Sequence, residues 1–340
     1  MKTSIELYNY DLPDNLIAHS PPLKRDSSKL MVFDKLYDSL EHTSFSNICD
    51  FINEGDLLVL NDTKVIPGRL YVKKESGGTV ELLFHKTLNS QNAICIFGTS
   101  RKLNIGSILH LNKQYYFTVT NIEQNYVTLQ SEHNIMRLFI KHGEIPLPKY
   151  IKRKVTEDDV NRYQTTYALN DGSVAAPTAG LHFTKEILNK LEKKGVLLEY
   201  LTLHVTYNTF KPVSSDNYLL HDIGSEYCEV NKSTIDNIKN VKNNNKRVIA
   251  VGTTATRALE NYATKLYKHD YKGEADLFIT PGYEFKIINA LITNFHLPKS
   301  TLLLLVASLV GRKKLFELYR KAIDHNYRFY SYGDSMMLKV

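Results

Sequence analysis

The chain has 340 residues and a mass of 39.0 kDa, which is enough for about two domains of roughly 150 residues each. A composition of 43% hydrophobic and 23% charged residues, with a mean hydropathy of -0.29, excludes a disordered chain and a multispanning membrane protein. The 43 Lys and Arg exceed the 36 Asp and Glu, so the net charge is +7 and a polyanionic partner is one hypothesis. Trp is absent and Tyr numbers 22, so a nucleic-acid base would stack on Tyr, Phe or His.

The sequence lacks a signal peptide, a membrane-spanning run and a cluster of cysteines. The first ten residues contain no apolar stretch of signal-peptide length, so we expect a cytoplasmic protein. The longest apolar run, 302–310, is far shorter than the roughly 20 residues that a bilayer span needs, which predicts no membrane association. Cys49, Cys95 and Cys228 are isolated from one another, and this spacing predicts no metal site.

Short runs of β-branched, aliphatic and aromatic residues follow one another between residues 56 and 130, separated by turn formers such as Gly77-Gly78. This pattern predicts a small antiparallel barrel or sandwich. Ser131 is then expected to cap a short helix that Gly143 ends. The predicted strands are 57–60, 69–73, 79–84, 93–97, 115–120 and 126–129.

Helix and strand patterns alternate in the second half of the chain, as in a layered α/β sheet. Thr184 is the predicted cap of a helix that Gly195 ends, and Ser300 or Thr301 caps an apolar helix. The pattern alone leaves open to which half residues 1–53 belong. Further strands are expected at 196–205, 247–251, 277–280 and 285–293. A loop followed by a helix is expected within 253–263, and an amphipathic helix at 313–325.

Polar side chains gather where two predicted elements meet. Asn61, Asp62 and Thr63 follow a buried strand, with Arg69 shortly after, and α/β enzymes place reactive groups at strand ends. The same residues also suit a turn that bonds its own backbone. In 172–183 the small residues around Thr178 and Gly180 would let a backbone approach a ligand closely, and His182 is either a ligand contact or a satisfied core histidine.

Three later segments are also candidates for a site. Thr253, Thr254 and Arg257 fit either a carboxylate or phosphate cradle or a Thr-rich helix start with a surface arginine. Asn294, His296 and Lys299 share one connection between an apolar strand and an apolar helix, which favours function because rigid flanks position loop residues. The third segment is 330–335, which includes Asp334. The motifs of zinc proteases, α/β-hydrolases, P-loops and dinucleotide folds are missing.

Nine motifs in one order, from about Tyr10 to Leu338, resemble the S-adenosylmethionine:tRNA ribosyltransferase-isomerase family. They are YDLP at 10–13, RDSS at 25–28, NDTKVIPGRL at 61–70, RYQT at 162–165, AAPTAGLHFT at 175–184, VGTT at 251–254, PGYEF at 281–285, TNFHLPKST at 293–301 and YGD at 332–334.

The resemblance implies a tRNA-modifying enzyme of queuosine biosynthesis. The ribosyl part of S-adenosylmethionine would be transferred to 7-aminomethyl-7-deazaguanine at the tRNA wobble position, giving epoxyqueuosine-tRNA, adenine and methionine. S-adenosylmethionine is then a consumed substrate, no cofactor is expected, and the protein is expected to act as a monomer. The implied fold is an α/β domain formed by 1–55 and 150–340, with an antiparallel β-barrel domain inserted at 56–149.

Roles follow from the chemistry that the resemblance implies. A base is needed because the sulfonium acidifies the neighbouring C5′ hydrogens, and the candidates are His182, His204, Glu226 and His296. Asp62 and Tyr283 are candidates to hold the sulfonium or the amine, and Arg257 to bind the methionine carboxylate. The other substrate-binding candidates are Asn61, Thr63, Arg69, Thr178, Gly180, Thr253, Thr254, Asn294, Lys299 and Asp334; those for tRNA are Lys149, Lys152, Arg153 and Lys154.

At some positions the residue differs from the one usual in that family. Thr206 and Asn208 stand where glycines are common, and Lys211 stands for Gln. Gly224 stands where a second histidine is usual, so a role of that histidine does not transfer, and Ala255 replaces Ser. Two other functions compete with the transferase: a noncatalytic RNA-binding protein with an OB-like barrel, and a methyltransferase, which the lack of a Gly-rich strand–loop–helix fingerprint disfavours.

Overall fold

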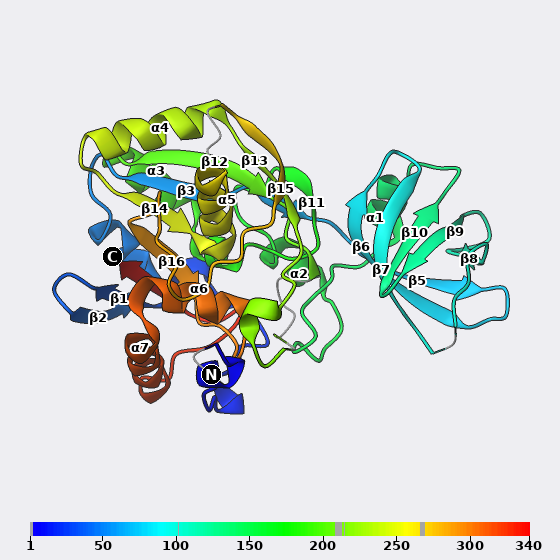
Figure 1. Cartoon of the computed structure of the whole chain (residues 1–340), viewed down its shortest axis with the longest axis horizontal. Coiled ribbons are helices and arrows are strands. Elements are labelled where there is room, and N and C mark those ends of the chain that lie inside the picture. Colours follow the sequence, from blue (N-terminus) through cyan, green and yellow to red (C-terminus); the bar gives the residue numbers. More distant parts are fainter. Residues whose placement is uncertain (1–2, 101, 208–212, 214, 266–268) are drawn as a thin grey trace. The chain divides into compact units, whose positions relative to one another are not determined.

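The computed structural model describes residues 3–100, 102–207, 213, 215–265 and 269–340 (Figure 1). The chain forms two compact units. The larger unit consists of Met1–Thr63, Gln164–Asn170 and Pro177–Val340, and the smaller unit of Lys64–Tyr163 and Asp171–Ala176. The smaller unit is therefore an insertion in the larger one, and the predicted α/β class with an inserted barrel is confirmed.

A nine-stranded mixed sheet in the order β15-β13-β12-β3-β14-β16-β17-β1-β2 forms the larger unit's core. Its middle strands β12, β3, β14 and β16 are mutually parallel. Every residue of β3, β14 and β16 is buried, as expected for aliphatic strands covered on both faces. The strands are β1 Lys29–Asp34, β2 Ser39–Ser44, β3 Leu57–Asn61, β12 Leu197–Leu203, β13 Glu226–Val230, β14 Val248–Val251, β15 Tyr271–Ala275, β16 Ala290–Asn294 and β17 Ser335–Lys339.

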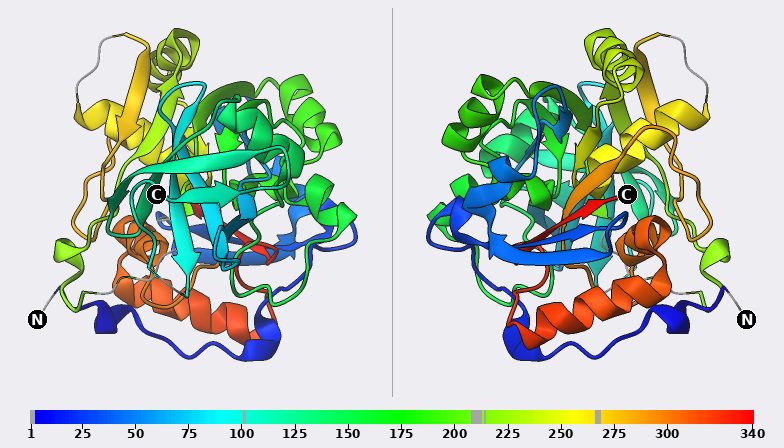
Figure 2. Two further views of the ribbon diagram at one scale, coloured as in Figure 1. Left: turned by 90° about the vertical axis from the view of Figure 1, so that its right-hand side faces the viewer. Right: turned by 90° about the vertical axis from the view of Figure 1, so that its left-hand side faces the viewer.

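Two helices of the larger unit begin at side-chain caps that the sequence predicts. The Thr184 hydroxyl accepts from the Ile187 amide and the Ser300 hydroxyl from the Leu303 amide, which confirms both predicted caps. The N-terminal segment (blue in Figure 2) runs beside α7, where the rings of Tyr10 and Tyr319 meet edge-on at 5.3 Å. The α-helices are α3 Lys185–Lys193, α4 Lys232–Asn243, α5 Gly252–Thr264, α6 Thr301–Val310 and α7 Arg312–Asp324; the 3-10 helices are η1 Ile5–Tyr8, η2 Asp14–Leu16, η3 Arg25–Ser27, η4 Phe45–Asp50, η5 Thr178–His182 and η7 Tyr218–Leu220.

The smaller unit is a closed six-stranded barrel in the order β10-β7-β6-β5-β8-β9, as the turn-separated runs predicted. Alternate strand residues such as Val72, Leu82, Cys95 and Val127 are buried and fill its interior. Its elements are β5 Arg69–Lys74, β6 Thr79–Thr87, β7 Asn92–Thr99, β8 Ile108–His110, β9 Tyr116–Glu123, β10 Tyr126–Gln130, α1 Ile135–His142 and α2 Glu157–Arg162. A separate two-stranded sheet consists of β4 Thr63–Val65 and β11 Asn170–Ser173.

The predicted placement of 57–60 in the barrel is wrong. This segment is β3, which pairs in parallel with β12 and β14 and belongs to the large sheet. An entirely buried aliphatic run suits the centre of a parallel sheet at least as well as a barrel, so the local pattern does not separate the two. The smaller unit therefore begins at Lys64, after β3, and its first segment ends at Tyr163.

Three local predictions are also wrong. Residues 277–280 form no strand, and the Leu277 carbonyl accepts instead from the Arg257 guanidinium. Asn134, not Ser131, caps α1 by accepting from the Arg137 amide, since the Ser131 hydroxyl accepts from the His133 amide. Helix α5 begins at Gly252, so no loop precedes it at residue 253.

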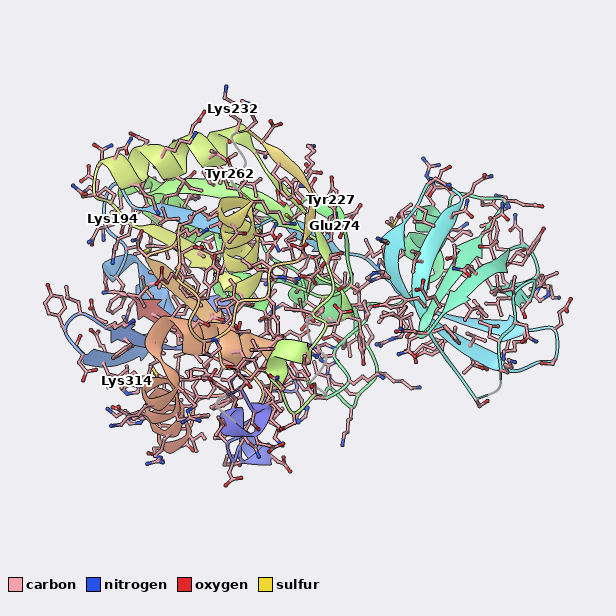
Figure 3. The ribbon with its side chains drawn as sticks, viewed as in Figure 1. Lys194, Tyr227, Lys232, Tyr262, Glu274 and Lys314 are labelled. Carbon is pink, nitrogen blue, oxygen red and sulfur yellow. The ribbon has the colours of Figure 1, made fainter. Side chains whose placement is uncertain are left out.

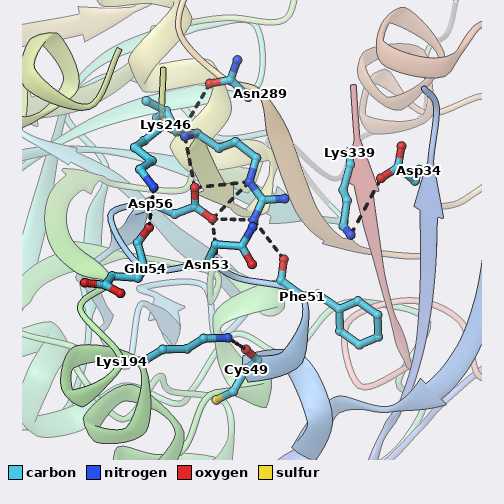
Figure 4. A network of polar contacts seen from close by, with 12 residues as sticks. Asp34, Cys49, Phe51, Asn53, Glu54, Asp56, Lys194, Lys246, Asn289 and Lys339 are labelled. Atoms are coloured by element: carbon cyan, nitrogen blue, oxygen red, sulfur yellow. Dashed lines mark hydrogen bonds and ion pairs between the residues drawn. The ribbon is translucent and has the colours of Figure 1, made fainter. Parts of the chain in front are cut away.

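A polar network ties together the amino ends of β3 and β14 (Figure 4). Asp56, which is 2% exposed, accepts from the Arg247 Nε at 3.1 and 3.2 Å and from the Asn53 amide. The Lys246 Nζ donates to the Glu54 carbonyl at 3.2 Å. These contacts hold the sheet from the end opposite to the polar segments that follow β3 and β14.

Across the described ranges, no helix combines the length and apolar character required to span a membrane.

Candidate active site

A pocket of about 370 Å³, including its open mouth, lies in the larger unit where β14 passes into α5. Two helices contribute their first turns to it: α5 through Thr253 and Thr254, and α6 through Thr301 and Leu302. The other polar lining residues are Glu226 and Arg257. Most of the wall is aliphatic or aromatic and consists of Ile223, Leu277, Phe278, Ile279, Leu302 and Leu305.

Glu226 and Arg257 form a buried ion pair at this wall, with 2.9 Å between Oε2 and Nη1. The Thr206 amide donates to the other Glu226 oxygen at 2.7 Å. The remaining Arg257 contacts are to main-chain carbonyls of Gly224, Ala275 and Leu277 at 2.8 to 3.0 Å. Four of the five guanidinium N–H groups are therefore engaged within the protein.

Two hydroxyls of the pocket have no hydrogen-bond partner. The Oγ1 atoms of Thr254 and Thr301 are both buried and make no hydrogen bond within the described part of the chain. Thr256, on the same helix as Thr254, differs because its hydroxyl donates to the Gly252 carbonyl at 3.1 Å. The position of Thr301 is not explained by capping, since Ser300 supplies the cap of α6.

A second polar cluster surrounds the buried His182 of η5. Its Nδ1 lies 2.8 Å from the Ser28 hydroxyl, and its Nε2 lies 3.2 Å from the Asn294 amide nitrogen. That nitrogen also donates to the Asp334 carbonyl at 3.4 Å, so the amide presents its donor to both groups. His182 Nε2 is therefore an acceptor, and Nδ1 carries the proton. Burial lowers the pKa of His182 to about 4, which keeps the ring neutral.

The third cluster lies at the carboxyl ends of β3 and β12. The Asp62 carboxylate accepts from the Thr202 hydroxyl at 2.7 Å and from the Asn170 amide at 3.1 and 3.2 Å. The Thr63 hydroxyl lies 2.8 Å from Nδ1 of His204. The two strands are parallel neighbours, which explains why residues 62–63 and 202–204 meet.

The His204 ring is half-buried and stacks on Tyr227 with 5.6 Å between ring centroids. Tyr227 in turn lies opposite Glu274 in the β13–β15 pairing, and Figure 3 shows both at this edge of the sheet. The Asn61 side chain binds the main chain of Leu203. Its amide nitrogen donates to the Leu203 carbonyl at 2.9 Å, and its amide oxygen accepts from the Leu203 N–H at 3.0 Å. Asn61 thus aligns the two strand ends.

His296 is buried, and its Nε2 lies 2.8 Å from the Thr293 hydroxyl. Burial lowers its pKa to about 3. Asp334 accepts from the Lys29 and Arg328 amides at 2.9 and 2.8 Å, and burial raises the pKa of its carboxyl. Both side chains hold neighbouring segments in place, and their predicted contacts with substrate stay predictions.

Other predicted residues have partners away from these clusters. The Tyr283 hydroxyl donates to Glu260 at 3.0 Å, and Lys299 pairs with Glu6 at 2.7 Å. In the smaller unit, Arg69 pairs with Glu81 at 3.0 Å. Arg153 binds Asp159 in bidentate fashion at 2.5 and 2.7 Å, next to the capping box of α2.

Among the remaining predicted residues, the three lysines Lys149, Lys152 and Lys154 are exposed. Thr178 is the first residue of η5. Asn208 and Lys211 lie outside the described residues. The close backbone approach predicted at Gly180 is made to Tyr167, whose hydroxyl oxygen would lie 2.1 Å from a Cβ at position 180.

Several residues of these clusters were not predicted. Ser28 and Thr301 stand within recognised motifs but were not assigned a contact, while Asn170 and Thr202 stand in no motif. For Ser28 and Thr301, their place in a family motif was the only signal in the sequence. Their contact partners are distant in the sequence, so no local pattern marks Asn170 or Thr202.

Parallel strands, polar clusters at strand ends and a pocket at two helix starts are the features of an α/β enzyme with an inserted barrel. The sequence profile of the queuosine biosynthesis protein family matches residues 5–338. This chain belongs to that family.

Relatives and a solved structure agree with this assignment. Proteins named S-adenosylmethionine:tRNA ribosyltransferase-isomerase from Halothermothrix orenii and Aquifex aeolicus are 44% and 43% identical, over 98% of this chain and 99% of each relative. The crystal structure of S-adenosylmethionine tRNA ribosyltransferase from Thermotoga maritima is similar with a TM-score of 0.58 and 33% identity, over 98% of this chain and 99% of that chain.

Proposed function

We propose that this chain transfers and isomerises the ribosyl part of S-adenosylmethionine onto 7-aminomethyl-7-deazaguanine at the tRNA wobble position. The products are epoxyqueuosine-tRNA, adenine and methionine. The observation that carries the proposal is identity of 42–44% over nearly the whole chain to relatives that bear the corresponding name. S-adenosylmethionine is consumed, no further cofactor takes part, and the protein works as a monomer in the cytoplasm.

We assign the base to His204 among the four candidates. A general base works best when its pKa lies near the working pH, and burial lowers the pKa of His182 and His296 far below 7. Glu226 is held by Arg257 and by the Thr206 amide. His204 is half-buried and adjoins the Asp62 cluster. Asp62 supports this placement because its carboxylate accepts from neutral groups and is suited to face a sulfonium cation.

We assign the main tRNA contact to the smaller unit. Its residues, 64–163 and 171–176, carry 15 Lys and Arg against 9 Asp and Glu, so this unit holds six of the seven excess positive charges. Phosphates of an anticodon stem-loop are the anions that such a surface attracts. Lys149, Lys152 and Lys154 are the exposed candidates, and Arg153 is already committed to Asp159.

Product analysis with precursor-bearing tRNA tests the reaction. Release of adenine and methionine supports ribosyl transfer, S-adenosylhomocysteine would indicate methylation instead, and neither product would indicate an RNA-binding protein. The base is tested by single-turnover adenine release. His204→Gln is expected to slow release by about 10²- to 10⁴-fold, and His182→Gln and His296→Gln by less. Full-rate release by His204→Gln would show that His204 is not the base.

A further inference from the structure

The pocket at the first turns of α5 and α6 contains a combination that packing does not explain. Thr254 and Thr301 are 8% and 3% exposed, and their hydroxyls have no partner among the described residues. A buried hydroxyl without a hydrogen bond costs free energy, and such groups in native proteins are normally satisfied. Both side chains line the same pocket, so a single ligand can satisfy both.

We propose that this pocket binds the neutral adenine base of S-adenosylmethionine, with hydrogen bonds to the hydroxyls of Thr254 and Thr301. This inference rests on the proposed function and adds which part of the substrate the pocket receives. It differs from the expectation that the Thr253 to Arg257 segment holds the methionine carboxylate.

The charges at the pocket favour a neutral ligand over a carboxylate. Arg257 is the cationic side chain in its wall, and it is paired with Glu226 at 2.9 Å. Its other engaged N–H groups point to main-chain carbonyls. A carboxylate entering the pocket would therefore meet a guanidinium whose charge is already compensated, with the Glu226 carboxylate beside it.

The residue composition of the wall favours a purine. Phe278, Leu302 and Leu305 supply apolar surface for the faces of a flat ring. A threonine hydroxyl both donates and accepts, so two of them match a base edge that carries ring-nitrogen acceptors and an amino donor. Methionine is favoured less, because its charged ammonium and carboxylate would lose their hydration against a wall that is mostly apolar.

The experiment is titration of the full-length protein with free adenine and, separately, with methionine by calorimetry. Thr254→Val removes the hydroxyl and keeps the shape, whereas Thr254→Ser keeps the hydroxyl. Thr256→Val is the matched control, because Thr256 lies on the same helix, is buried and does not line the pocket. Circular dichroism and thermal melts establish that each variant is folded.

We expect Thr254→Val to raise the Kd of adenine by about fivefold, and Thr254→Val with Thr301→Val by about 25-fold. Thr254→Ser should restore near-wild-type adenine binding, Thr256→Val should leave it unchanged, and the Kd of methionine should be unaffected throughout. Equal adenine affinity in the Val and Ser variants, or a selective loss of methionine binding, would overturn the proposal.

Adenine titration and adenine release together distinguish a wrong pocket assignment from a wrong reaction. If the wild-type enzyme releases adenine during turnover but the adenine titration is insensitive to Thr254, the pocket assignment is wrong and the reaction stands. If adenine binding depends on Thr254 but no adenine is released with precursor-bearing tRNA, the purine pocket is supported and the proposed reaction is wrong.

Discussion

The backbone of Gly180 passes directly against the ring of Tyr167. A Cβ added at position 180 would lie 2.1 Å from the Tyr167 hydroxyl oxygen and 2.9 Å from Cγ2 of Thr165. That hydroxyl is buried and forms no hydrogen bond among the described residues. The glycine in the segment before His182 is thus required by its packing against Tyr167 and Thr165.

Gly180→Ala should therefore destabilise the protein by roughly 1–3 kcal/mol through overpacking. Tyr167→Phe removes the clashing oxygen, so the double variant should recover part of this loss. Unfolding in urea measures both effects. Gly78→Ala is the control, because the nearest atom outside its chain neighbours is 3.8 Å away. Additive effects of the two substitutions would contradict the contact.

Glu226→Gln should lower the free energy of unfolding by about 3 kcal/mol, because it leaves the Arg257 charge buried without its anion. Urea denaturation measures this, and Lys321→Ala, which breaks an exposed pair with Glu317, should leave the free energy of unfolding nearly unchanged. Unchanged stability together with abolished adenine release would instead favour Glu226 as the base.

Acid should destabilise the protein through its two buried histidines. His182 and His296 have folded-state pKa values of about 4 and about 3, below the unfolded value of 6.5, so protonation favours the unfolded chain. The stabilisation is complete above pH 6.5 and falls by about 1.4 kcal/mol per histidine for each pH unit down to about pH 4. Urea curves at pH 7, 6 and 5 measure the slope, and His182→Gln should reduce it. Parallel pH dependence in variant and wild type would refute the assignment.

Raising the salt concentration should weaken tRNA binding far more than S-adenosylmethionine binding, because only tRNA releases condensed counterions. Lys152→Gln with Lys154→Gln should make the log–log salt slope of tRNA binding shallower by about 1.5. Lys232→Gln with Lys239→Gln, both on α4 of the larger unit, should leave the slope unchanged; Figure 3 labels Lys232. An identical slope in both double variants would place the tRNA contact elsewhere.

The local sequence pattern was sufficient to predict elements that depend only on residues within the same segment. Alternating burial in β5 and β10 and capping by Thr184 and Ser300 depend on residues close in the sequence, so these elements were predictable. The pattern assigned the strand at 57–60 to the wrong sheet and predicted a strand at 277–280 that does not form, because strand pairing depends on which distant strand is available.

The family, the α/β class with an inserted barrel, and the motif segments in which the polar clusters lie could all be predicted from the amino-acid sequence. How those side chains are used could be seen only in the folded chain. It paired Arg257 with Glu226, closed Gly180 against Tyr167, and brought Thr254 and Thr301 to one pocket. The physical reason is that hydrogen bonds, charge pairing and burial depend on neighbours that the parallel sheet brings together from distant parts of the chain.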